Sequence, residues 1–354
     1  MVRWLLSGDY PRGLALNLGI AAIVLALLFA PFLFPGTRAL NTAATICIFI
    51  VLVASYDLLL GYTGIVSFAH TMFYGIGAYG VAILLQRYGA SWGAVFAGLG
   101  FGLAVSVLLA FVIGLFSLRV KAIFFAMVTL AVASAFAILA SQLSGLTGGE
   151  DGLTYRVPRM LTPAFRLMDE QLLGVTMNGR IIAYYLVFVV SAVAFLVMMR
   201  IVNSPFGRVL ASIRENAFRA EALGVRTVVY RSLASCLAAG FATLAGALMA
   251  LWLRYTGPDV TLSFTIMVDI LLMVVIGGMG TMYGAIVGAA AFILAQNYLK
   301  DLMGHMAEAT AGIPVLPDLL HPDRWLLWLG LLFILSVYFF PTGIVGRLRK
   351  SRQA

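Results

Sequence analysis

Three ionisable side chains lie within or at the edge of long apolar runs of this sequence: Asp57, Asp269 and His70. An aspartate at the centre of a bilayer costs about 2.5–3.5 kcal/mol on insertion scales, so such groups pair with a partner or line a path. We expect Asp269, the deeper acid, to pair with a hydroxyl, amide or arginine, or to line a path. Asp57 lies near the end of its run, which favours a structural role. A neutral imidazole in lipid needs a hydrogen-bond partner, so His70 is expected to face the interior of a helix bundle.

Glycines concentrate in two stretches of the sequence. The first contains Gly61, Gly64, Ser67 and His70, and the second contains Gly277, Gly278 and Gly280. Small residues let helix backbones approach closely in membranes, and they also let a helix open where protein or water covers the freed backbone groups. Two interpretations of the first stretch therefore stay open, namely close helix packing and a solute path lined by Ser67, His70 and nearby backbone. The similarity of the two stretches is a weak sign of two related halves with broken helices.

Nucleotide-binding and metal-binding motifs are absent from the sequence. It contains no G-x-x-x-x-G-K-[ST] phosphate loop and no H-E-x-x-H zinc motif, and its three histidines are scattered. Cys47 and Cys236 lie in apolar runs and form no C-x-x-C pair, so they give no zinc or redox signature. We therefore expect a chain that is not an enzyme and that binds no metal or other cofactor itself.

The composition is typical of a membrane protein. Of the 354 residues, 62% are hydrophobic and only 10% are charged, with a mean hydropathy of +1.03, whereas soluble domains carry roughly 25% charged residues. Apolar runs of about 20 residues are long enough for transmembrane helices. We predict an all-α polytopic membrane protein, a single domain over residues 1–354 that forms a helical bundle of about ten transmembrane segments. We place these segments near 13–34, 40–60, 64–85, 92–118, 122–141, 181–199, 232–253, 263–282, 284–299 and 325–341.

One long polar interruption, residues 200–231, carries six arginines and two glutamates. Cytoplasmic loops of membrane proteins are rich in Lys and Arg, so this interruption is predicted to be cytoplasmic. With ten spans, both termini are also cytoplasmic, and residues 142–180 and 300–324 form extracytoplasmic loops that either cap the outer mouth or merely connect spans. The net charge of +9 follows this topology pattern, and we therefore expect no nucleic-acid partner.

The polar interruption is predicted to contain a short amphipathic helix. Pro205 and Gly207 break the preceding helix, residues 208–223 have helical periodicity, and Gly224 stands where a helix C-cap belongs. Such a helix could lie among the lipid headgroups, where its basic residues meet anionic lipid. It could equally be a docking helix for a soluble motor.

Four stretches, taken in order, resemble the inner-membrane permeases of branched-chain amino acid ABC importers, the LivM-type family. They are D-L-L-L-G-Y-T-G at 57–64 with Ser67, His70, Phe73 and residues 75–79; T-G-G-E-D-G-L at 147–153; S-P-F-G-R at 204–208 with I-R-E-N at 213–216 and A-E-A-L-G-V at 220–225; and I-G-G-M-G-T-M-Y-G at 276–284. Together they cover roughly residues 40 to 300. The third stretch resembles the E-A-A loop of this family.

The resemblance implies that the 200–231 loop forms a coupling helix that fits a groove on an ATPase subunit. The residues that would meet that subunit are Arg214, Glu215, Asn216, Glu221, Ala222 and Gly224. It further implies a second homologous permease chain, two ATP-binding subunits that hold ATP and Mg, and a periplasmic substrate-binding protein, all at a bacterial inner membrane. The expected cargo is a branched-chain or other small amino acid, and urea or a short amide is the alternative.

Residues near the pathway divide into two groups. The candidates for lining it are Ser67, His70 and Asp269, and the candidates for structural positions beside it are Asp57, Gly61, Gly64, Gly277, Gly278 and Gly280. A rival function from a different class is a secondary transporter or channel that works without an ATPase. It needs an ion or proton site, for which Asp269 is the best candidate.

Overall fold

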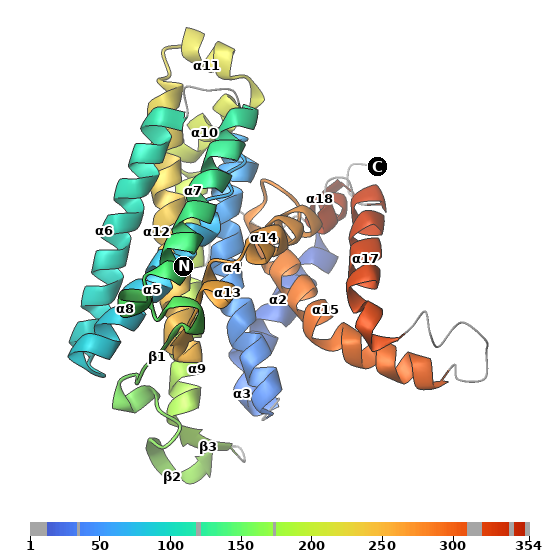
Figure 1. Cartoon of the computed structure of the whole chain (residues 1–354). Helices are drawn as coiled ribbons and strands as arrows, with labels where there is room; N and C mark the ends of the chain where they lie inside the picture. Colours follow the sequence, from blue (N-terminus) through green and yellow to red (C-terminus); the bar gives the residue numbers. More distant parts are fainter. Residues whose placement is uncertain are drawn as a thin grey trace.

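The computed structural model describes residues 13–33, 36–117, 122–172, 175–309, 321–339 and 343–350, which are largely helical (Figure 1). Within these residues, seven helical segments are long and apolar enough to cross a membrane. They comprise α4 (Thr37–Thr63), α6 (Trp92–Ser117), α7 (Ala122–Gln142), α9 (Gly179–Asn203), α12 (Thr227–Leu253), α14 (Phe264–Gly277) with the short α13 (Pro258–Thr261) before it, and α15 (Met282–Ala309). The other three predicted segments coincide with the apolar helices α2 (Leu14–Leu28), α5 (His70–Tyr88) and α17 (Trp325–Phe339). The predicted all-α polytopic membrane fold is confirmed, with ten as an approximate number of segments.

Short elements lie between or after these helices. They are α3 (Ala30–Leu33), α8 (Ser144–Thr147), α10 (Pro205–Glu215), α11 (Ala217–Ala222) and α18 (Gly343–Lys350), with strands β1 (Leu153–Thr154), β2 (Arg166–Leu172), β3 (Val175–Asn178) and β4 (Tyr255–Thr256). Helices α10 and α11 project from one end of the bundle, and the β2–β3 hairpin projects from the opposite end (Figure 1). The loop predicted at 200–231 and the loop predicted at 142–180 therefore lie at opposite ends.

The centre of the bundle is built on the close approach of α5 to α12. A Cβ atom at Gly77 of α5 would overlap with the backbone carbonyl of Thr243, and one at Gly246 of α12 would overlap with the carbonyl of Tyr74. The Thr243 hydroxyl is also 2.6 Å from the hydroxyl of Ser106 on α6. Close helix packing, one of the two interpretations of the glycine-rich stretch, is thus what the structure shows for α5.

The third predicted segment is interrupted at its start. Helix α4 runs on to Thr63, residues 64–69 are not helical, and α5 begins at His70. Gly64 has φ +71°, in the left-handed region, and it ends α4 as a C-cap. This region costs a residue with a side chain about 1–2 kcal/mol, so glycine suits the position.

The segment 142–180 folds against the bundle. Strand β1 pairs antiparallel with β4, which follows α12, so that Leu153 lies opposite Thr256. The hydroxyl of Tyr155 lies 2.9 Å from both the Ala250 carbonyl, to which it donates, and the Thr256 hydroxyl. Burial raises the pKa of Tyr155 above its ordinary value, so this donor stays protonated. The segment is therefore more than a simple connection between two spans.

The predicted loop 300–324 begins too early, because α15 continues as a helix to Ala309. Residues 300–309 are rich in good helix formers such as Leu, Met, Ala, Lys and Glu. Asp301 in this extension forms an exposed ion pair with Arg38 at 2.6 Å, a type of contact that contributes little stability. Residues 310–320 of the predicted loop lie outside the described residues, as do residues 1–12 and 351–354 at the two termini.

Candidate functional site

The polar interruption folds into two short helices, α10 and α11, instead of the single helix predicted over 208–223. Asn216 breaks the helix because it adopts an extended conformation, and its side-chain oxygen accepts the Arg219 N–H at 2.9 Å as the N-cap of α11. Ser204 caps α10 by accepting the Gly207 N–H. Gly224, with φ +88°, follows the end of α11 as predicted.

The tip of this loop exposes two large apolar side chains. Phe218 on α11 is 83% exposed and Leu223 just after it is 80% exposed. Sequence reasoning missed both, although a phenylalanine beside Asn216 and Arg219 is an apolar residue on an otherwise polar face. Exposed apolar groups that project from a polar surface are typical of a protein-binding site.

All six predicted coupling residues are exposed. Two of them, Arg214 and Glu221, also contact other parts of the chain. Glu221, also exposed, accepts a hydrogen bond from the Thr227 hydroxyl at the start of α12. Glu221 thus ties α11 to the next span.

Arg214 reaches back into the bundle. Its guanidinium donates to the backbone carbonyl of Gly61 near the end of α4. Its Cγ would lie 3.4 Å from a Cβ atom at Gly64, and its Nη1 would lie 2.6 Å from a Cβ atom at Gly280. Both glycines have φ in the left-handed region, +71° at Gly64 and +75° at Gly280, which is why glycine suits both positions.

Asp57 joins the same site from within α4. Its side chain is 2% exposed, and Oδ1 accepts the backbone N–H of Gly280, in the loop between α14 and α15, at 2.9 Å. Oδ2 has no hydrogen-bond partner among the described residues. We call Asp57, Gly61, Gly64, Arg214 and Gly280 the coupling cluster. It connects α10 to the end of α4 and to the α14–α15 loop, so the structural role predicted for Asp57 and these glycines is consistent with the geometry.

The other two glycines of the second stretch lie beside this cluster. A Cβ atom at Gly277 would overlap with the carbonyl of Gly284, and Gly278 has φ +117°. Both allow the tight turn between α14 and α15.

Of the three pathway candidates, His70 and Ser67 are buried. His70 is fully buried, with Nε2 2.8 Å from the Ser55 hydroxyl and its ring 5.2 Å from that of Tyr56. The Ser55 hydroxyl also lies 2.8 Å from the Leu52 carbonyl. Ser67, 5% exposed, accepts the Ala69 N–H at 3.4 Å. His70 therefore has the partner in the bundle that the sequence predicts.

Asp269 lies in the middle of α14 and is half-buried, on the helix that packs along α15. Its side chain lies near Gln296 of α15. Its assignment to the pathway stays a prediction.

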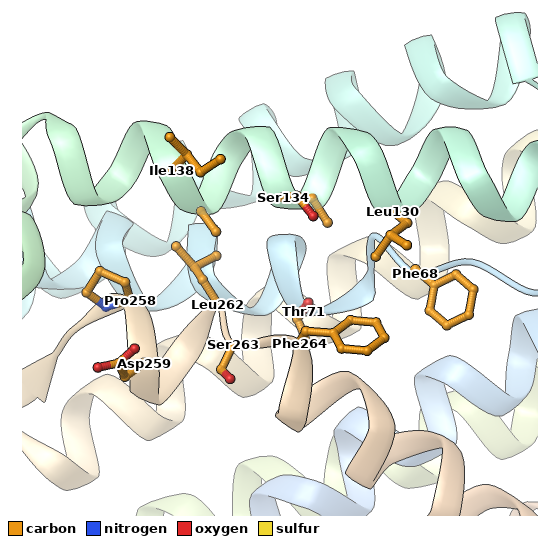
Figure 2. Close-up of a pocket in the computed structure, with 12 residues that line it drawn as sticks. Phe68, Thr71, Leu130, Ser134, Ile138, Pro258, Asp259, Leu262, Ser263 and Phe264 are labelled. Atoms are coloured by element: carbon orange, nitrogen blue, oxygen red, sulfur yellow. The ribbon is translucent and has the colours of Figure 1, made fainter.

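A groove opens at a different place, between α7, the start of α5 and the α13–α14 segment (Figure 2). Its volume is about 260 Å³. Its polar lining comes from Thr71, Ser134, Asp259 and Ser263, and its apolar lining includes Phe68, Leu130, Ile138, Leu262 and Phe264. It continues into a second space of about 450 Å³ lined by Ser141 and Glu150 as well as Asp259. None of Ser67, His70 and Asp269 is among the residues that line it.

A family described as "Branched-chain amino acid transport system / permease component" matches residues 38–337. The chain belongs to this family. It is 27% identical over 318 residues to the high-affinity branched-chain amino acid transport system permease protein LivM of Salmonella typhimurium, and 25% identical over 317 residues to the LivM protein of Escherichia coli. Each match covers 86% of this chain and 73% of the relative. A probable branched-chain amino acid transport permease protein LivM of Methanocaldococcus jannaschii is 28% identical over 251 residues, 67% of this chain and 65% of that protein. No solved structure matches significantly.

Membership of this permease family makes the chain a multi-pass membrane component of a transport system. The matched range contains both the coupling cluster and the groove. Across the described residues, no group of three or more His, Cys, Asp or Glu side chains is placed to hold a metal ion.

Proposed function

We propose that this chain is the permease subunit of an ABC importer that moves a branched-chain amino acid across a bacterial inner membrane. The family match over residues 38–337 supports the transport class. The names of the relatives favour branched-chain amino acids over urea or a short amide as cargo. A second homologous permease and a periplasmic substrate-binding protein complete the assembly, and both termini of the chain lie in the cytoplasm.

ATP and Mg are held by two partner ATP-binding subunits, which dock on α10 and α11. The observation that carries this docking is the exposure of Phe218 and Leu223 at the tip of a short, arginine-rich loop. The positive-inside rule supports a cytoplasmic location for that loop. Burying a phenylalanine side chain contributes about 1.5–3 kcal/mol, so Phe218 alone accounts for a substantial share of a docking energy.

The coupling cluster gives the docked motor a route into the membrane. When the ATP-binding subunits move α10 and α11, Arg214 pulls on the Gly61 carbonyl at the end of α4. The bond from Asp57 to Gly280 passes the same displacement to the α14–α15 loop. Helices α9 and α12, at either end of the loop, move with it. ATP-driven motion thus reaches α4, α9, α12 and the α14–α15 loop from one loop.

A copurification experiment tests the docking. The chain is expressed with its candidate ATP-binding subunits, and Phe218→Ala is compared with the unmutated chain. We expect docking roughly ten- to hundredfold weaker, which is the affinity equivalent of losing one buried phenylalanine. Tyr88→Ala is the matched control, since Tyr88 is 75% exposed at the far end of α5 and should not change docking.

A secondary transporter, the rival function, would need no ATP-binding subunit. If no ATP-binding subunit copurifies with the unmutated chain and uptake continues after ATP is depleted, the importer assignment is wrong. A cysteine placed at Phe218 also tests the topology. It should react with a membrane-impermeant thiol reagent only after the cells are opened, and reaction in intact cells would reverse the assigned orientation.

A further inference from the structure

We propose that the groove between α7, α5 and α14 binds the zwitterion of a branched-chain α-amino acid as it passes through the chain. The proposal rests on the function above and names the site and chemistry that this function needs. In it, the carboxylate lies at the first turns of α5 and α14, the ammonium lies toward Asp259, and the branched side chain lies on the apolar wall.

The size of the groove suits a small ligand. Pockets for drug-sized ligands occupy roughly 300–1,000 Å³ and are mostly apolar with a few placed polar groups. At about 260 Å³ this groove lies just below that range. Figure 2 shows Ile138, Ser134 and Leu130 along α7, across the groove from Thr71 and Phe264. The lining is therefore apolar with a few hydroxyls, as a branched aliphatic amino acid requires.

Two helices begin at the groove. The first turn of α5, which has no side-chain cap, supplies Thr71. At the start of α14, Ser263, whose hydroxyl accepts the Thr265 N–H, and Phe264 line the groove. The first N–H groups of a helix lack partners within it, and the aligned peptide dipoles make this end attractive to anions. Broken membrane helices place such ends against anionic groups of a substrate. A carboxylate is the anionic group of an amino acid.

An unpartnered hydroxyl supports this position independently. Thr71 is only 3% exposed and lines the groove, yet its hydroxyl has no hydrogen-bond partner in the described part of the chain. In membrane helices a threonine hydroxyl usually bonds to backbone or to a neighbouring helix. Ser134 lines the facing side of the groove on α7, where it is exposed. The Thr71 hydroxyl can donate to a carboxylate that lies at the start of α5.

Asp259 supplies the opposite charge. It is the one charged residue in the lining of the smaller space, and it is exposed with no hydrogen-bond or ion-pair partner within the described ranges. Glu150 adds a second carboxylate in the outer space. Among the described residues, no arginine or lysine lines either space. An ammonium therefore meets negative charge on the outer side, while the carboxylate meets the helix ends.

Cysteine protection tests the site directly. Cys47 and Cys236 are replaced by alanine, Ser134→Cys is introduced, and thiol labelling is measured in membranes that contain the full-length chain and its copurifying subunits. L-leucine should slow labelling. The analogue 4-methylpentanoate lacks the ammonium and 3-methylbutylamine lacks the carboxylate, so each should need about tenfold higher concentration for the same protection. Ser144→Cys is the matched control, because Ser144 is exposed on α8 and does not line the groove.

A second variant tests the role of Asp259 through ligand discrimination. In the Ser134→Cys background, Asp259→Asn should abolish the advantage of L-leucine over 4-methylpentanoate while the advantage over 3-methylbutylamine remains. A merely structural role would weaken all three ligands together, which would remove Asp259 from the site.

The outcomes separate the groove from the proposed function. If L-leucine is taken up by the unmutated chain with its partners but slows labelling at neither position, or slows both equally, the groove is not the site and the function stands. If uptake fails while labelling at Ser134→Cys is slowed, the site stands and the importer assignment falls.

Discussion

Asp57→Asn distinguishes a hydrogen-bonding role of Asp57 from a role of its negative charge. The variant should keep function in the first case and lose it in the second. Its side chain is 2% exposed, Oδ1 accepts the Gly280 N–H at 2.9 Å, and Oδ2 has no partner among the described residues. Asp57→Asn keeps an oxygen where Gly280 needs an acceptor. Asp57→Leu keeps the approximate size and removes the acceptor.

The structure sets the size of each effect. Asp57→Leu leaves a half-buried N–H of Gly280 without its partner, which costs about 1–3 kcal/mol. That cost lowers the population of the observed α14–α15 turn roughly five- to 150-fold relative to competing arrangements. Asp57→Asn loses the attraction to Arg214 but also removes the cost of burying a carboxylate. We therefore expect Asp57→Asn to change stability by less than about 1 kcal/mol.

Two measurements distinguish the variants. Thermal unfolding of the purified chain should show a clear loss of stability for Asp57→Leu only, and ATP-driven uptake should follow the same order. If Asp57→Asn folds normally but abolishes uptake as completely as Asp57→Leu, the charge itself is required. The structural role assigned to Asp57 in the coupling cluster would then be wrong, and a proton-coupled transporter would explain the chain better.

Three further substitutions probe the packing and the coupling. Gly77→Ala should destabilise the chain by about 1–3 kcal/mol in thermal unfolding, because the new methyl group overlaps with the backbone of α12; Gly19→Ala, with nothing within 4 Å, should cost nearly nothing. Ser55→Ala should cost about 1–3 kcal/mol by removing the partner of His70, while the KM for uptake stays unchanged, and a raised KM would instead place His70 in the path. Leu272→Pro kinks α14 at a cost of about 3 kcal/mol or more, and it should leave ATP-binding subunits docked but reduce uptake more than ATP hydrolysis.

Much of the fold follows from the sequence because lipid imposes simple rules. Apolar runs long enough to span a bilayer predicted helices at all ten positions. The boundaries were less predictable. Helix α15 extends to Ala309 because good helix formers continue past the apolar run. The boundary predicted from hydropathy was too early because hydropathy does not measure helix propensity.

The candidate site was predictable in part. A glycine that follows a run of helix-forming residues commonly marks the end of a helix, so the role of Gly224 could be predicted from the sequence. Asn216 caps α11, but the sequence around it is compatible with either one continuous helix or two helices. The extended backbone conformation of Asn216 shows that there are two. Arg214 is exposed, and its bond to the Gly61 carbonyl, far from it in sequence, could not be read from the sequence. Its assignment to a partner surface came from the resemblance and stays a prediction.

The groove was missed for a related reason. Ser67 and His70 were chosen as pathway candidates because burying a polar side chain in lipid costs free energy. A hydrogen-bond partner within the bundle offsets that cost as well as a water-filled path does. Ser55 supplies the partner for His70. Thr71, next in sequence, has none, and it is the residue that lines the groove.

Helix α14 connects the two sites described here. Its first residue, Phe264, lines the groove, and Gly280, just beyond its last residue, belongs to the coupling cluster. A helix of 14 residues spans about 20 Å, and this one packs along α15. A displacement that Asp57 passes from α4 to the α14–α15 loop is therefore transmitted along α14, because a helix transmits axial motion along its hydrogen-bonded backbone. The far end must move with it, and that end forms one wall of the groove. In the proposed importer, motion driven from α10 thus changes the shape of the proposed amino-acid site, as coupling of ATP hydrolysis to transport requires.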